Sequence, residues 1–106
     1  MASSIDRASP STAAGVDHVR LAYDYIEKGD ADGYASLLDA HAQVRGVGAG
    51  TRSHHELYKI IATGDSVVVT GRYSAPSAEF DFADVFTLSD VGLLLSHRRF
   101  RELDEN

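Results

Sequence analysis

The stretch Glu79-Phe80-Asp81-Phe82-Ala83-Asp84-Val85-Phe86-Thr87-Leu88 decides the expected fold of this chain. Large side chains stand at every second position, which is the period of a β-strand with one buried face. The inward face is predicted to consist of Phe80, Phe82, Asp84, Phe86 and Leu88. A carboxylate among three phenyl rings loses its hydration. Asp84 is therefore expected either to hold its proton more tightly than a free aspartate, whose pKa is roughly 3.9, or to pair with a cation.

Further strands are predicted on both sides of this stretch. Residues 66–73 are rich in β-branched side chains and follow a turn at Gly64-Asp65, while residues 93–100 follow a turn at Asp90-Val91-Gly92. An earlier strand is expected at 42–47, before a glycine-rich loop.

Residues 54–62 fit two kinds of element. Ser53 and Glu56 have the spacing of a capping box, which favours a helix. Tyr58, Ile60 and Ile61 also suit a strand. The residues by themselves leave this segment open.

Two helices are predicted before the strands. The first, from about Val16 to Lys28, has one apolar face made of Val16, Val19, Tyr23 and Ile26. Gly29 is expected to end it, and Asp30 to cap a second helix. That helix is expected to place Tyr34, Leu37, Leu38 and His41 on one face. Residues 1–15 are interpreted as a disordered tail before one α+β domain at 16–103.

Composition restricts the function classes. The chain has 106 residues, which is the length of one domain, and a net charge of −6. An acidic surface repels phosphate backbones and anionic lipids, so nucleic acid and membrane partners are not expected. Cysteine is absent, which excludes disulfides and thiolate chemistry and indicates a cytoplasmic protein. No apolar stretch is long enough to span a bilayer.

Four segments carry a resemblance to a known superfamily. They are Ala22-Tyr23-Asp24-Tyr25-Ile26-Glu27-Lys28-Gly29-Asp30, Gly64-Asp65-Ser66-Val67-Val68-Val69-Thr70-Gly71, Phe82-Ala83-Asp84-Val85-Phe86 and Gly92-Leu93-Leu94-Leu95-Ser96-His97-Arg98-Arg99-Phe100. In this order they resemble the nuclear transport factor two-like superfamily, nearest to its SnoaL-like polyketide cyclases and ketosteroid isomerases. The resemblance covers nearly everything after the tail. It implies a cone: a bent, mainly antiparallel sheet wrapped over helices around an apolar pocket. It also implies that residues 54–62 form a strand.

Two departures from the family pattern concern the pocket. A third helix usually follows the first strand, but here only residues 48–53 bridge that gap, so this helix is expected to be shortened or missing. The general base of ketosteroid isomerases falls at about Gly46, which has no side chain. Steroid isomerisation by that route is therefore not expected.

Asp84 is the principal candidate for chemistry. The resemblance implies an acidic residue here that stabilises an oxyanion or transfers a proton. The alternative is an aspartate that pairs with an arginine and only orders the sheet. Arg45 and Arg72 lie on predicted strands and are candidates to neutralise it or to bind a substrate carboxylate, with a solvated strand face as the favoured alternative.

Two further residues are proton-transfer candidates. His97 is expected on the strand beside Asp84, on one face with Leu93 and Leu95, where histidine suits proton transfer near neutral pH. Its alternative is a hydrogen-bonded core residue. Tyr23 resembles a family hydrogen-bond donor, with core packing as the alternative. The pocket is expected to be lined by Phe80, Phe82, Phe86, Arg45 and Tyr34.

The function implied by the resemblance is a cofactor-independent cyclase, isomerase or dehydratase. It would act by general acid–base chemistry on an apolar, carbonyl-bearing metabolite of polyketide or other secondary metabolism. The alternative is a non-catalytic small-molecule-binding or dimerisation module of the same fold. No metal site or cofactor is predicted, and a homodimer is expected because a cone lacking a helix exposes apolar sheet surface.

Overall fold

The computed structural model describes residues 10–44 and 53–101 of the chain. Its elements, in chain order, are the helices α1 (Pro10–Lys28) and α2 (Ala31–Ala35) and the strands β1 (Leu38–Val44), β2 (His54–Thr63), β3 (Ser66–Ala75), β4 (Ala78–Leu88) and β5 (Leu94–Arg101). Two helices against one five-stranded sheet make an α+β fold, as predicted. Neither described helix is both long and apolar enough to cross a membrane.

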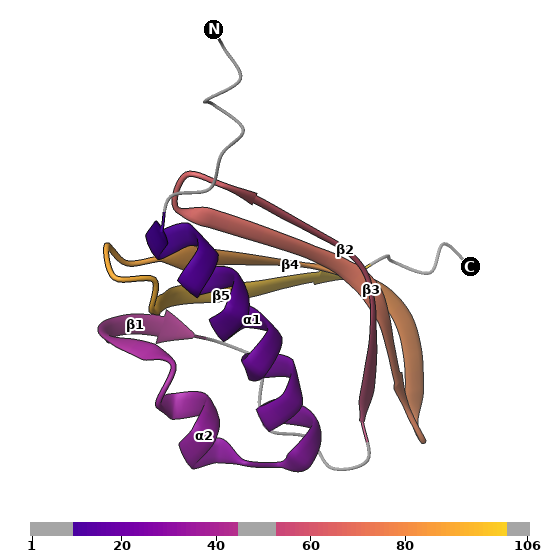
Figure 1. The fold of residues 1–106 in the computed structure, drawn as a ribbon. Coiled ribbons are helices and arrows are strands. Elements are labelled where there is room, and N and C mark those ends of the chain that lie inside the picture. Colours follow the sequence, from indigo (N-terminus) through magenta and orange to yellow (C-terminus); the bar gives the residue numbers. More distant parts are fainter. Residues whose placement is uncertain (1–9, 45–52, 102–106) are drawn as a thin grey trace, which may run out of the picture.

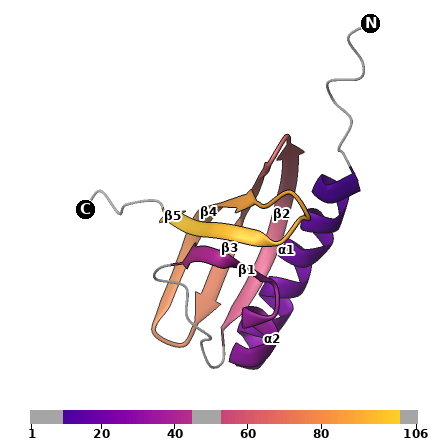
Figure 2. The same cartoon turned by 90° about the vertical axis from the view of Figure 1, so that its left-hand side faces the viewer.

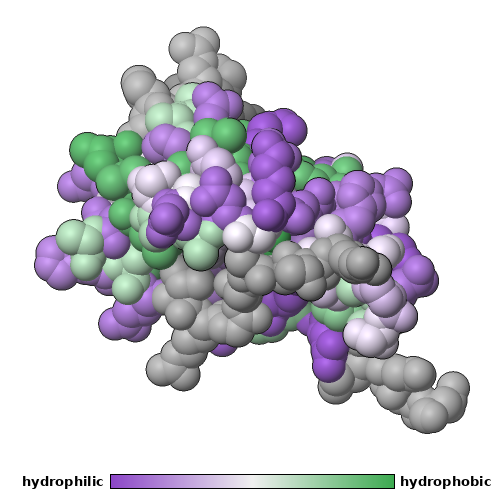
Figure 3. All heavy atoms as spheres, turned by 90° about the horizontal axis from the view of Figure 1, so that it is seen from below, coloured by the Kyte–Doolittle hydropathy of each residue, from purple (hydrophilic) through white to green (hydrophobic). Residues whose placement is uncertain are grey.

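The sheet has the strand order β1-β5-β4-β3-β2. β1 runs parallel to β5, and the other neighbours are antiparallel. The long strands β2, β3 and β4 bend around α1, which lies in the hollow of the sheet, and α2 lies at its lower end (Figure 1; Figure 2). Seen from that end, most of the coloured surface is hydrophilic, with hydrophobic residues between (Figure 3). The hydrophobic interior lies between the sheet and α1.

The alternation in β4 defines the inner face of the sheet. Phe82, Asp84, Phe86 and Leu88 are all buried, as their spacing predicts, and Phe80 is half-buried at the end of the strand. The apolar face of α1 covers them with Val19, Ala22, Tyr23 and Ile26. The core is thus a single layer between one helix and one sheet.

A bulge in β5 changes which of its side chains point inward. Thr87 pairs with Ser96 whereas the next residue, Leu88, pairs with Leu94, so Leu95 is an extra residue on the β5 side. An extra residue shifts the alternation by one position. Leu94 and His97 therefore both face the core at 0% exposure. The expectation that His97 shares its face with Leu93 and Leu95 was wrong, although its inward orientation is confirmed.

The first helix begins at Pro10, six residues before the expected start. Proline suits a first helical turn because its fixed φ is helical and its missing N–H needs no partner. The Thr12 hydroxyl donates to Gly64 O at 2.6 Å, and Gly15 packs directly on Leu88. Residues 10–15 therefore belong to the helix, not to a tail.

The second helix is shorter than predicted. Asp30 caps it by accepting from Gly33 N at 2.8 Å, as expected, but the helix ends at Ala35. Leu38 and His41 lie in β1, because backbone pairing of Leu37 with Leu94 draws this segment into the sheet. The strand expected at 42–47 thus begins at Leu38.

The segment at 54–62 is a strand, as the resemblance implied. Nine residues, 45–53, separate β1 from β2, and the expectations for Arg45, for Gly46 and for the loop at 48–52 lie outside the described residues.

Candidate functional site

Asp84 is the centre of a buried polar cluster. It stands directly opposite Arg99 in the pairing of β4 with β5, and both side chains point inward. The guanidinium makes a bidentate pair, with Nε 2.8 Å from Oδ1 and Nη2 2.7 Å from Oδ2. From α1, the Tyr23 hydroxyl donates to Oδ2 at 2.6 Å. Arg99 from β5 and Tyr23 from α1 therefore supply three hydrogen bonds to one carboxylate.

His97 extends this cluster towards α2. Its Nε2 lies 3.0 Å from Asp84 Oδ2, close enough for an ion pair although without hydrogen-bond geometry. Its Nδ1 lies 2.9 Å from the Tyr34 hydroxyl. The ring stacks on Phe86 with centroids 4.0 Å apart, which fixes its orientation. With a proton on Nε2, facing the carboxylate, the ring accepts from the Tyr34 hydroxyl at Nδ1.

The electrostatics of Asp84 differ from the expectation. Burial raises its pKa, but the hydrogen bonds from Arg99 and Tyr23, together with the close approach of His97, outweigh burial and lower the pKa to about 2. The expectation that Asp84 titrates above a free aspartate was therefore wrong, and the alternative of a cationic partner holds. Asp84 is therefore a carboxylate near neutral pH and not a proton donor there.

The two tyrosines of the cluster are held in their neutral form. Burial, together with the charge of Asp84, raises the pKa of Tyr34 to about 12. The same causes raise the pKa of Tyr23 further, because its hydroxyl donates to the carboxylate. Both hydroxyls therefore act as hydrogen-bond donors near neutral pH.

The cationic partner of Asp84 is Arg99, and Arg72 has the solvated position favoured for it. Arg72 lies on the outer face and pairs with Asp81 at 2.9 Å and Glu79 at 3.2 Å. Arg99 was overlooked, although its position two residues after His97 places it on the same strand face. What the sequence does not show is the strand register that sets it opposite Asp84.

Glu27 and His55 form a second, partly buried pair. The side chain of His55 is 1% exposed whereas that of His54 is 71% exposed, so one ring is buried and the other faces solvent, as predicted for adjacent strand residues. The Nδ1 of His54 still lies 3.7 Å from Glu27 Oε1. The backbone N–H of His55 donates to Glu27 Oε2, and Nδ1 lies 3.3 Å from the same oxygen. The sequence reasoning missed this pair, because its members are 28 residues apart.

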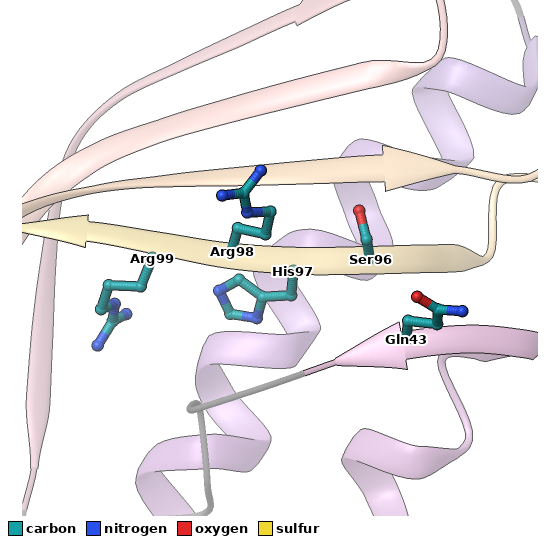
Figure 4. A pocket seen from close by; sticks show the side chains of 5 residues that line it. All are labelled: Gln43, Ser96, His97, Arg98 and Arg99. Atoms are coloured by element: carbon teal, nitrogen blue, oxygen red, sulfur yellow. The ribbon is translucent and has the colours of Figure 1, made fainter.

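A pocket of about 460 Å³ adjoins the cluster. Its described lining comes from β1 and β5 and consists of Gln43, Ser96, His97, Arg98 and Arg99. Figure 4 shows His97 and Arg99 pointing away from β5 on the side opposite Ser96 and Arg98. His97 itself has no exposed surface, so a ligand reaches its Nδ1 only when the Tyr34 hydroxyl moves aside.

The predicted pocket aromatics lie beneath the polar groups. Phe82 packs under the Arg99 guanidinium, with the Phe82 ring centroid 4.4 Å from Arg99 Cζ. Phe86 packs under His97. Phe80 stacks on Tyr73 at the far end of β4. None of these three is among the described lining of the pocket. The part of the chain that the structure describes contains no group of three histidine or acidic side chains able to hold a metal ion.

Comparison with known proteins identifies the fold. No protein-family model matches the sequence, and no curated protein is significantly similar to it. Solved structures do match. A candidate ketosteroid isomerase from Kribbella flavida superposes with a TM-score of 0.74 at 13% identity, over 91% of this chain and 83% of the other.

Two further structures agree. A candidate SnoaL-like polyketide cyclase from Jannaschia sp. CCS1 has a TM-score of 0.74 at 18% identity, over 91% of this chain and 90% of the other. A protein of unknown function with the same fold from Mesorhizobium loti has a TM-score of 0.74 at 9% identity, over 91% and 97%. The resemblance seen in the sequence is confirmed at the level of the fold: the chain has the nuclear transport factor two-like architecture of these three structures.

Proposed function

We propose that this protein is a small enzyme that moves a proton on an apolar, carbonyl-bearing metabolite, in a reaction of cyclase, isomerase or dehydratase type. One observation carries the proposal: a buried Asp84 holds His97 and Arg99 at the edge of a pocket. Buried charges are costly, and their concentration beside a cavity is typical of functional sites.

The geometry supports a division of roles. His97 is the base, since Nδ1 accepts a proton while Asp84 stabilises the resulting imidazolium. Arg99 uses Nε and Nη2 to hold Asp84, which leaves Nη1 outside that pair to donate to the ligand oxygen as it gains negative charge. Asp84 and Tyr23 are positioning residues. The proton leaves the carbon next to the carbonyl, its bonding electrons form an enolate, and no cofactor is required.

The fold supports this proposal without determining it. Among the structures that match are candidate cyclases and isomerases, but the same fold also serves proteins of unknown function. Function resides in the site and not in the fold. The polar cluster is therefore the stronger support.

A second candidate function is a non-catalytic binding or dimerisation module. It is favoured by the closure of the cluster: Asp84 is fully paired, and Tyr34 covers the accepting nitrogen of His97. In this alternative the polar cluster specifies the fold, and the pocket binds a ligand without catalysing a reaction.

Hydrogen–deuterium exchange separates the two candidates. We would incubate 2-tetralone with the protein in D₂O and follow loss of the proton signal next to the carbonyl by NMR. An enzyme accelerates this exchange over buffer, and His97→Gln, checked for folding by circular dichroism, reduces the acceleration by about 10²-fold or more. The matched control is His41→Gln on the exposed part of β1, which keeps full activity. Binding of the ketone without accelerated exchange would leave the binding module as the function.

A further inference from the structure

His55 has a buried nitrogen that the cluster around Asp84 does not use. Glu27 holds its backbone N–H and faces Nδ1 at 3.3 Å. With the ring proton on Nδ1, facing the carboxylate, Nε2 carries the lone pair. Nε2 is buried and has no hydrogen-bond partner among the residues that the structure describes. An unpaired acceptor in an interior costs free energy, and such groups call for an explanation.

The surroundings of this nitrogen are aromatic. The ring of His55 lies 5.1 Å from Tyr23, 5.2 Å from Tyr73 and 5.5 Å from Phe82, measured between centroids. Arg99 contacts two of the same rings, with Cζ 4.4 Å from Phe82 and 5.7 Å from Tyr73. An unpaired acceptor and a cationic donor therefore flank one pair of aromatic rings.

The charges around His55 keep its ring neutral. Burial and the Arg99 guanidinium lower its pKa, and these effects exceed those of Glu27 and Asp84, which raise it. The groups that face it are Glu27 and Tyr23 from α1, Tyr73 from β3, Asp84 from β4 and Arg99 from β5. A neutral ring offers Nε2 as a hydrogen-bond acceptor near pH 7.

We propose that His55 is a specificity-determining residue whose Nε2 accepts a hydrogen bond from a hydroxyl group of the ligand, while Arg99 donates to a carbonyl oxygen of the same molecule. Glu27 is the positioning residue, because its contact with Nδ1 leaves the lone pair on the buried Nε2. The ligand class is then an aromatic or conjugated ketone that also carries a hydroxyl. This inference rests on the proposed function, which supplies the carbonyl-bearing ligand, and adds His55 as the residue that selects a hydroxyl on that ligand.

The tautomer of His55 gives a test that needs no ligand. ¹⁵N NMR of the histidine rings in the full chain is expected to show the proton of His55 on Nδ1 at neutral pH. Glu27→Gln removes a charge that raises the pKa of His55, so the pKa falls in that variant, whereas His41→Gln leaves it unchanged. A His55 ring protonated on Nε2 would overturn the proposal.

Binding of matched ketones tests the selection itself. The probes are the three isomers of hydroxyacetophenone, compared with acetophenone by NMR titration. The wild type is expected to bind at least one hydroxyl isomer about tenfold more tightly than acetophenone, since a donor meets a buried acceptor. His55→Phe keeps an aromatic ring but removes the acceptor, so that preference disappears while acetophenone binding remains. Glu27→Gln weakens the preference, and His41→Gln retains it.

The outcomes separate this inference from the proposed function. If His55→Phe keeps the wild-type preference, or the wild type has none, the role of His55 is refuted while ketone binding stands. If the wild type binds none of these ketones, the carbonyl-bearing ligand class fails and the inference falls with it. If His55→Phe does not fold, the Glu27→Gln titration decides: an unchanged preference refutes the proposal.

Discussion

At the scale of single residues, Asp84 and Arg99 depend on each other. The carboxylate has no exposed surface, and the guanidinium is its bidentate partner. An Asp84 that kept its proton would tolerate Asp84→Asn, because the amide has nearly the same shape as the neutral acid. The ionised, paired Asp84 does not, because the amide leaves the partly buried Arg99 without its counter-charge. Breaking a buried pair on one side costs about 3–5 kcal/mol.

We therefore expect Asp84→Asn to lower the free energy of unfolding by about 3 kcal/mol or more, measured by urea denaturation at pH 7. Asp81→Asn is the matched control, since it lies on the outer face of the same strand in an exposed pair with Arg72. Exposed pairs contribute about 1 kcal/mol or less. Equal stability of Asp84→Asn and the wild type would contradict a paired Asp84.

The lowered pKa of Asp84 makes stability depend on pH in a defined window. Its folded pKa is about 2 against an ordinary 3.8, so the unfolded chain binds this proton first as pH falls. The stabilisation is complete above about pH 5 and is lost as pH falls through 4 towards 2, by about 2 kcal/mol in total. Denaturation curves from pH 7 to 2.5 should show this loss in the wild type and a correspondingly smaller loss in Asp84→Asn. Identical pH profiles for the two proteins would speak against a depressed pKa.

At the scale of elements, Gly71 allows β2 and β3 to approach each other. A Cβ at this position would lie 2.3 Å from the backbone oxygen of Glu56, which cannot move without breaking the pairing. The register of the two strands shifts between Leu57 and Lys59, directly beside Gly71. The bend that lets the sheet curl around α1 is thus associated with a residue that has no side chain.

Gly71→Ala is expected to destabilise the protein by about 2–4 kcal/mol, because the backbone of β2 must shift. Thermal or urea unfolding measures the effect, and Thr70→Ala on the neighbouring position of β3 is the control, with a change of about 1 kcal/mol or less. A Gly71→Ala protein as stable as the wild type would show that the sheet yields easily at this point.

At the scale of the whole molecule, the outer face of the sheet carries apolar side chains. The pairing places Ile61, Val68 and Val85 in one row across β2, β3 and β4, and Phe100 beside Ala83 in the next row. Ile61 and Phe100 are about half exposed. Contiguous apolar surface of this kind marks contacts between proteins.

We expect a homodimer formed through this outer face, with a two-fold axis that sets the same patch of both copies together. Light scattering at high micromolar concentration measures the mass. Ile61→Glu should shift the protein to a monomer. Tyr25→Glu, on the half-buried side of α1 away from this face, is not a suitable control, because Tyr25 packs against Gly33. Asp90→Lys, an exposed turn residue, changes charge without touching the patch and should leave the mass unchanged. A wild-type protein that is monomeric throughout would refute the dimer.

The sequence by itself determined the elements whose cause is local. The alternation in 79–88 predicted the inner face of β4, and the spacing of Val19, Tyr23 and Ile26 predicted the buried face of α1. Asp30 was predicted to cap α2, because an aspartate at this position accepts a hydrogen bond from the backbone N–H three residues later, here that of Gly33. The resemblance in four short segments added the bent, mainly antiparallel sheet and the strand at 54–62. Each of these follows from residues close together in the chain.

Only the tertiary structure decided the charge and hydrogen bonding of the candidate site. The bulge at Leu95 sets the inward face of β5, and the register of β4 and β5 places Arg99 opposite Asp84. That pairing turned an expected protonated acid into a carboxylate. Likewise, Glu27 meets His55 only because α1 crosses β2. The physical reason is that a pKa depends on charges within a few ångströms, and strand register decides which charges those are.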